Sequence, residues 1–135
     1  MGVKMKIAIV LDEELGKGFI ANAAACIASG LFNNEKNLLG AEINGKDCTF
    51  IPITKIPILI LKKNKQTWSE LLEIAKSKKL KYMVFTQEGQ STISYDEYIE
   101  RVKDKHISEL TIVGFGVFGE DKIINSFSGN LPLLH

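Results

Sequence analysis

The sequence has few of the residues that build metal centres and disulfide frameworks. Its 135 residues include two cysteines, two histidines, three prolines and one tryptophan. Cys26 and Cys48 stand alone, in neither a CxxC pair nor a metal-ligand spacing, so neither a disulfide framework nor a zinc site is expected. His106 and His135 are too few to indicate a metal centre, and no Ser-His-Asp triad is supported. We therefore expect no metal and no cofactor.

Long hydrophobic runs and a charge excess are also absent. No apolar stretch approaches the ~20 residues that span a bilayer, and Asp12-Glu13-Glu14 interrupts any signal-peptide core. Seventeen basic and sixteen acidic residues give a formal charge of +1, so the global field does not favour nucleic acid. We expect a cytoplasmic protein with no membrane partner, folded as a single domain over residues 1–135.

The segment from Met5 to Phe32 combines an apolar run, a glycine loop and an alanine-rich stretch. Residues 7–11 predict a strand buried on both faces, Gly16-Lys17-Gly18 a loop, and residues 19–31 a helix. Such a connection directs backbone N–H groups and the positive end of the helix at an anionic or carbonyl ligand. The alternative is a tight connection that binds nothing.

The rest of the chain alternates strands with helices. Thr67 with Glu70 and Ser94 with Glu97 form capping boxes, and Gly129 or Asn130 is expected to end the last helix in a left-handed cap. The predicted elements are strands at 56–61 (central), 82–86 and 110–115, helices at 68–79, 95–105 and 121–127, a hairpin turning at Asn44-Gly45, and a polar loop at 87–92. This order predicts a three-layer α/β domain, with helices on both faces of a mainly parallel sheet and the hairpin at its edge.

Residues 16–21 also match the G-x-G-x-x-[G/A] dinucleotide fingerprint between a strand and a helix. The fingerprint needs an acidic residue at the end of the next parallel strand, about 20 residues on. The next segment is a polar loop and a hairpin, where Glu35 and Glu42 are poor candidates. A nucleotide site is therefore disfavoured.

Glu88 follows the strand at 82–86, at the same sheet edge as the Gly16 loop if both strands are parallel. Gln87, Ser91 and Thr92 would then converge with Glu88 on the mouth of the first helix. A carboxylate beside a hydroxyl can orient a water molecule for ester hydrolysis. The alternative is a solvated polar loop, which the spacing by itself favours.

A family resemblance runs along almost the whole chain. It rests on the ordered motifs Gly16-Lys17-Gly18, Pro57-Ile58-Leu59-Ile60-Leu61-Lys62, Gln87-Glu88-Gly89, Thr111-Ile112-Val113-Gly114-Phe115-Gly116 and Ser128-Gly129-Asn130-Leu131-Pro132-Leu133. In these the chain resembles the archaeal and eukaryotic (type-two) peptidyl-tRNA hydrolases, which cleave the ester joining a peptide to the tRNA ribose. The resemblance implies a three-layer α/β/α fold with a mixed four-stranded sheet flanked by helices, a homodimer, and tRNA as partner.

The resemblance also assigns roles to residues. The family's catalytic acid matches Glu88 and its two threonines match Thr92 and Thr111, while its lysine at the helix start falls on Phe19, which can neither attract phosphate nor polarise a carbonyl. Lys17 could reach the same space from the loop. Lys17 and the helix N-terminus would then stabilise the oxyanion or grip a phosphate. Gly16, Gly18, Phe19 and Gln87 would line the ligand site.

The helix at 95–105 stands between the two threonines, where the hydrolases have a short turn, and would lid or block the site. With Ala21-Asn22-Ala23-Ala24-Ala25, Phe85-Thr86 and Tyr95-Asp96-Glu97-Tyr98, it identifies the chain as a member of an uncharacterised bacterial family that shares the hydrolase fold and has no assigned activity. Two functions stay open. One is hydrolysis of peptidyl-tRNA or a related ester, and the other is a non-catalytic module that binds a small anion or a protein partner above the Gly16 loop.

Overall fold

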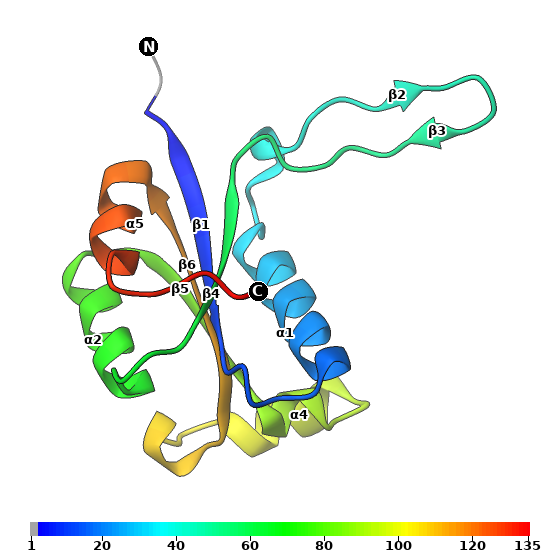
Figure 1. Ribbon diagram of the computed structural model, residues 1–135. Coiled ribbons are helices and arrows are strands. Elements are labelled where there is room, and N and C mark those ends of the chain that lie inside the picture. Colours follow the sequence, from blue (N-terminus) through cyan, green and yellow to red (C-terminus); the bar gives the residue numbers. More distant parts are fainter. Residues whose placement is uncertain (1–2) are drawn as a thin grey trace.

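A four-stranded sheet forms the centre of the molecule in the computed structural model, which describes residues 3–135 (Figure 1). The strand order is β4-β1-β6-β5. Strand β1 (Met5–Leu11) is parallel to β4 (Ile58–Lys62) and antiparallel to β6 (Ile112–Glu120), and β6 is antiparallel to β5 (Lys81–Thr86). The sheet is therefore mixed, as the resemblance implies, and the mainly parallel sheet expected from the alternation of elements is wrong.

This topology brings distant segments to one edge of the sheet. Because β6 is antiparallel to both of its neighbours, β1, β4 and β5 all run in the same direction. Their carboxyl ends therefore share one edge with the start of β6. We call this the carboxyl edge, and it lies at the bottom of Figure 1.

Helices cover both faces of the sheet, so the predicted three layers are confirmed (Figure 1). Helix α1 (Lys17–Leu31) covers one face, while α2 (Trp68–Ser77) and α5 (Asp121–Ser128) cover the other. The alternation along β1 assigns each side chain to a face. The residues packed toward α1 are Ile7, Ile9 and Leu11, and those packed toward α2 and α5 are Ala8 and Val10.

Two glycines of β6 allow α1 to approach the sheet closely. A Cβ atom at Gly116 would lie 2.3 Å from Cγ2 of Ile27 and 2.8 Å from Cδ1 of Leu31, and one at Gly114 would lie 2.7 Å from Cδ1 of Ile27. These distances are shorter than van der Waals contact, so a side chain at either position would require Ile27 or Leu31 to move. The glycines thereby let the second half of α1 lie close to β6.

The predicted central strand at 56–61 is instead the edge strand β4. The C-terminal tail covers it, because the Lys62 N–H donates to the Pro132 carbonyl (2.9 Å) and the Leu134 N–H donates to the Ile60 carbonyl (3.0 Å). An edge strand presents unpaired backbone groups, and the tail satisfies part of them.

The hairpin predicted at Asn44-Gly45 forms, but away from the main sheet. Its strands β2 (Ile43–Asn44) and β3 (Thr49–Phe50) make a separate two-stranded ribbon that projects from the body (Figure 1). The turn is closed by the Gly45 N–H, which donates to the Cys48 carbonyl (2.8 Å). The expectation that the ribbon lies at the sheet edge is wrong, since Ile43 is 62% exposed and Phe50 is 55% exposed.

Helix α3 (Gln87–Gln90) occupies part of the segment predicted as a polar loop, and α4 (Tyr95–Val102) follows it. The hydroxyl of Thr86 caps α3 by accepting from the Gly89 N–H (3.0 Å). The predicted capping hydroxyls are confirmed, because Thr67 accepts from the Glu70 N–H (3.1 Å) and Ser94 from the Glu97 N–H (3.4 Å). The carboxylate half of each predicted capping box is wrong, because Glu70 accepts from the Thr67 hydroxyl (3.3 Å) and Glu97 pairs with Arg101. Short 3-10 turns occur at η1 (Lys36–Leu38) and η2 (Ile107–Glu109).

Two expectations about where elements end are wrong. The strand predicted at 110–115 continues to Glu120, because Gly116 and Gly119 keep pairing with β1 and do not end the strand. The last helix does not end in a left-handed cap, since Gly129 has φ −57° and ψ −28°. Within residues 3–135, none of the helices has the length and apolar character needed to cross a membrane.

We predict that Gly116→Ala destabilises the protein by about 1 to 3 kcal/mol, the usual cost of overpacking a filled core. The cause would be the contact of the added methyl with Ile27 and Leu31. Urea unfolding followed by circular dichroism measures the change. The matched control is Gly18→Ala, where the new Cβ meets no atom within 4 Å. Equal midpoints for both variants and the wild type would contradict the proposed role of Gly116.

Candidate functional site

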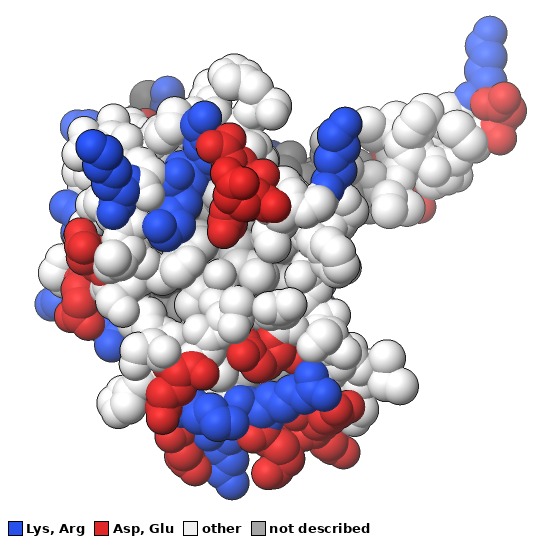
Figure 2. Space-filling model, turned by 60° about the horizontal axis from the view of Figure 1, so that its bottom comes forward, with Lys and Arg blue, Asp and Glu red and all other residues white. Residues whose placement is uncertain are grey.

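Charged side chains gather in two groups around the carboxyl edge, with an uncharged band of surface between them (Figure 2). Two hollows open near the carboxyl edge, the Phe19 hollow and the Trp68 hollow, each named after the aromatic residue in its wall.

The Phe19 hollow has a volume of about 460 Å³. Its walls combine apolar side chains, uncharged amides and hydroxyls, and two carboxylates. The lining residues are Asp12, Glu14, Leu15, Gly16, Phe19, Gln87, Gln90, Ser91, Thr111, Ile112 and Val113. Such a mixture of apolar walls and a few polar groups is typical of small-molecule sites.

The N-terminus of α1 forms one wall of this hollow. Gly16 is the N-cap residue, with φ −62° and ψ 151°, and no side chain caps the helix there. The first N–H bonded within the helix at this end is that of Ile20, which donates to the Gly16 carbonyl (3.0 Å). The N–H groups of the first turn are therefore available to an oxygen atom of a ligand.

A side-chain amide fastens α3 to α1 across the hollow. Nε2 of Gln90 donates to the Phe19 carbonyl (3.0 Å) and to Oδ1 of Asn22 (3.1 Å). Because both acceptors belong to the first two turns of α1, this contact sets the width of the hollow. Phe19 itself is 60% exposed beside it, which is unusual for a phenylalanine.

Glu88 uses its carboxylate to hold the start of β6. Its Oε1 and Oε2 accept from the Thr111 N–H at 3.0 Å and 3.2 Å, and the Gln87 N–H donates to the Thr111 carbonyl (2.8 Å). The carboxylate therefore lies at the rim of the Phe19 hollow and already serves a backbone donor.

Thr92 lies in a different depression, on the side of α3 that faces α4. Its hydroxyl donates to the Gly89 carbonyl (3.0 Å), and its neighbours there include Tyr95 and Tyr98. Burial raises the pKa of Tyr98, and the nearby Tyr95 raises it further. No α4 residue lines the Phe19 hollow, so the expected lid over that site is not formed by α4.

Arg101 anchors α4 to α3. Its guanidinium donates to the Glu88 carbonyl (3.3 Å) and to Oγ of Ser91 (3.0 Å), and it pairs with Glu97. Helix α4 is thus attached to the segment that carries Glu88.

Of the residues predicted for the site, the structure brings Gly16, Phe19, Gln87 and Thr111 together in one hollow. Gly18 lines a neighbouring depression together with Asn22 and with Gly16, Phe19 and Gln90, which also line the Phe19 hollow. Lys17 is exposed at the first position of α1 and lines neither depression. Glu88 and Thr92 do not line the Phe19 hollow, and they bond to different partners, Glu88 to the Thr111 N–H and Thr92 to the Gly89 carbonyl.

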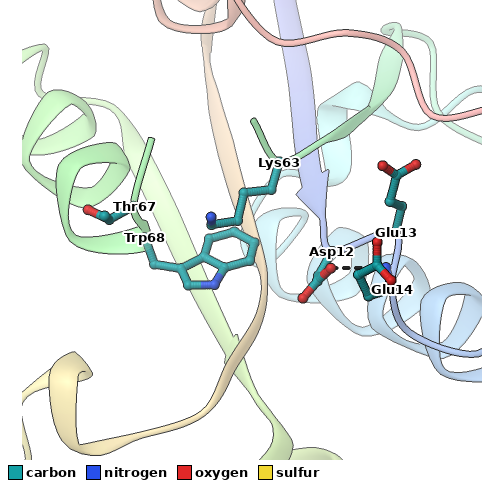
Figure 3. Close-up of a pocket in the computed structure, with 6 residues that line it drawn as sticks. All are labelled: Asp12, Glu13, Glu14, Lys63, Thr67 and Trp68. Carbon is teal, nitrogen blue, oxygen red and sulfur yellow. Dashed lines mark hydrogen bonds between the residues drawn. The ribbon is translucent and has the colours of Figure 1, made fainter. Parts of the chain in front are cut away.

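Sequence reasoning missed a second hollow at the same edge, the Trp68 hollow (Figure 3). It measures about 440 Å³ and is lined by Asp12, Glu13, Glu14, Lys63, Thr67 and Trp68. The acidic triplet after β1 and Trp68 at the start of the helix after β4 are visible in the sequence, but only the parallel pairing of β1 with β4 brings them together. Asp12 and Glu14 line both hollows.

In the Trp68 hollow an ammonium group already lies over the indole. Nζ of Lys63 is 5.7 Å from the ring centroid, within the range of a cation–π contact. Asp12 points toward the same space from the opposite wall, and its Oδ1 accepts from the Glu14 N–H (3.0 Å; Figure 3). Within residues 3–135, no cluster of three or more His, Cys, Asp or Glu side chains is arranged to hold a metal ion.

The sequence profile described as Protein of unknown function (DUF2000) matches residues 5–135. No curated protein matches the chain. Among solved structures, the chain is similar to a protein of unknown function, Atu0240, from Agrobacterium tumefaciens strain C58. The TM-score is 0.87 at 16% sequence identity, over 99% of this chain and 100% of that one, which establishes a shared fold.

We predict that Glu88→Ala lowers the free energy of unfolding by about 1 kcal/mol and speeds amide exchange at Thr111, because the Thr111 N–H loses its acceptor. Glu88→Gln, which keeps an oxygen acceptor, should recover part of the loss. The control is Glu100→Ala, an exposed glutamate of α4. Unchanged exchange at Thr111 in Glu88→Ala would contradict the structural role of this carboxylate.

Proposed function

This chain belongs to the family of proteins of unknown function DUF2000, and we propose that it binds a small, uncharged ligand carrying a carbonyl oxygen in the Phe19 hollow. The observation that carries the proposal is the hollow itself. It combines an uncapped helix N-terminus, apolar walls and an exposed aromatic side chain in about 460 Å³.

The polar groups of the hollow favour a carbonyl over an anion. The first turn of α1 offers N–H donors, as does the side-chain amide of Gln87. The carboxylates of Asp12 and Glu14 line the same hollow and would repel a phosphate or a carboxylate. A neutral amide or ester satisfies the donors without this repulsion, and its apolar part can contact Leu15, Phe19 and Ile112.

Hydrolysis of an ester is the second candidate function. It is favoured by one observation, the convergence of Gly16, Phe19, Gln87 and Thr111 on one hollow, since these positions are the ones the hydrolase resemblance implies. The hydrolase-like fold, tRNA as partner and the homodimer belong to this second proposal. Two observations weigh against it, the bond of Glu88 to the Thr111 N–H and the place of Thr92 in another depression, so binding ranks first.

We predict that N-acetyl-L-leucine methyl ester, a neutral probe with an ester, an amide and an apolar side chain, shifts the amide resonances of Lys17, Gly18 and Phe19 in ¹H–¹⁵N spectra. Phe19→Ala should bind about fivefold more weakly, because an aromatic contact is worth about 1 kcal/mol. The residue is 60% exposed, so the variant should remain folded.

Phe50→Ala is the matched control for this experiment, because Phe50 is 55% exposed on the β2–β3 ribbon, away from the hollow. It should bind the ester as the wild type does. Resonance shifts spread over the surface, or equal affinity of Phe19→Ala and Phe50→Ala, would sink the binding proposal.

The same samples separate binding from hydrolysis. Release of methanol from the bound ester by the wild type, lost in Glu88→Gln, would support the second candidate. A model peptidyl-tRNA incubated with wild type and with Phe19→Lys extends the test to the substrate that the resemblance implies. We expect binding of the ester without turnover, and no tRNA release by either protein.

A further inference from the structure

We infer that the Trp68 hollow binds an organic cation, and that the ligand of this protein therefore carries an ammonium or guanidinium group beside its carbonyl. The inference deepens the proposed function and rests on it for the position of the carbonyl. The juxtaposition that carries it is an indole face, two carboxylates and an open volume of about 440 Å³ between them (Figure 3).

The indole face is suited to a cation. Trp68 is only partly buried at the start of α2, and Nζ of Lys63 lies over its ring at 5.7 Å. The Lys63 ammonium is not ion-paired to the acidic loop, and its hydrogen bond goes to the Asn64 carbonyl (3.4 Å). The position of Lys63 therefore shows where the ring stabilises a positive charge. Because the Lys63 side chain is long and flexible, it can move away and a ligand cation can take its position.

The opposite wall supplies negative charge that is not neutralised. Among residues 3–135, Glu13 pairs with Lys62 (3.4 Å), whereas Asp12 and Glu14 form no ion pair. Asp12 points toward the space beside Trp68, and one of its oxygens holds the Glu14 N–H (Figure 3). A cation between Asp12 and the indole would meet a carboxylate on one side and a π face on the other.

The shared wall defines the class of ligand. Asp12 and Glu14 line both hollows, so a molecule with its cation beside Trp68 can extend past this loop into the Phe19 hollow. Its carbonyl would then meet the N-terminus of α1. The two hollows together thus fit a small amino ester or amino amide, with a hydrocarbon spacer between the charged and the carbonyl groups.

The test uses the full chain and its single tryptophan, Trp68, as the reporter. Titration with n-butylammonium should change the Trp68 emission at millimolar concentration, while the neutral analogue n-butanol should not. Asp12→Asn should weaken butylammonium binding roughly threefold or more, and Lys63→Met should strengthen it roughly two- to fivefold by removing the resident ammonium.

Glu73→Gln is the matched control, because it makes the same change of charge on α2 at a side chain that is 75% exposed and outside the hollow. It should leave butylammonium affinity within twofold of the wild type. Three results would overturn the inference: no emission change with butylammonium, equal weakening by Asp12→Asn and Glu73→Gln, or binding confined to Lys63→Met, which would make Lys63 the permanent occupant.

A second set of probes separates this inference from the proposed function. The methyl esters of 6-aminohexanoic and 8-aminooctanoic acid carry both groups, and one of them should bind at least tenfold more tightly than n-butylammonium. Butylammonium binding without any ester-dependent shift at the first turn of α1 would defeat the proposed function and leave the cation site. Ester shifts at α1 without butylammonium binding would do the reverse.

Discussion

The close contact between α1 and β6 is the constraint on which the candidate site depends. Gly114 and Gly116 leave room for Ile27 and Leu31 of the helix. At the other end of α1, Nζ of Lys81 donates to the carbonyls of Leu31 and Asn33, each at 2.8 Å. The C-terminal end of α1 is therefore capped, and its middle packs against the sheet. Its N-terminus has no side-chain cap and lies at the carboxyl edge.

The antiparallel strand β6 decides which polar groups accompany that N-terminus. Because β6 runs between β1 and β5, its start brings Thr111 to the edge where β5 ends and α3 begins. The Glu88 carboxylate accepts a hydrogen bond from the Thr111 N–H across this junction. Because the Glu88 carboxylate is bonded to this backbone N–H, it stabilises the wall of the hollow. The geometry therefore favours a binding site over a site in which Glu88 and a threonine activate water.

The acidic loop after β1 gives the site its electrostatic character. It lies between two hollows and contributes Asp12 and Glu14 to both, with Trp68 at one end and Phe19 at the other. A helix N-terminus by itself attracts anions, but two nearby carboxylates oppose them over distances of a few ångströms. The combination selects a ligand with an uncharged oxygen at α1 and positive charge near Trp68, and membership of the DUF2000 family is compatible with any such ligand.

The sequence by itself determined most of the elements, because the apolar run of β1, the hydroxyl caps at Thr67 and Ser94, and the Asn44-Gly45 turn act within a few residues. The grouping of Gly16, Phe19, Gln87 and Thr111 was implied by the family resemblance. Tertiary structure alone decided the direction of β6, the detachment of the ribbon, and the Trp68 hollow. It also decided the bond between Glu88 and the Thr111 N–H, since each of these depends on contacts between segments far apart in the chain, where local patterns carry no information.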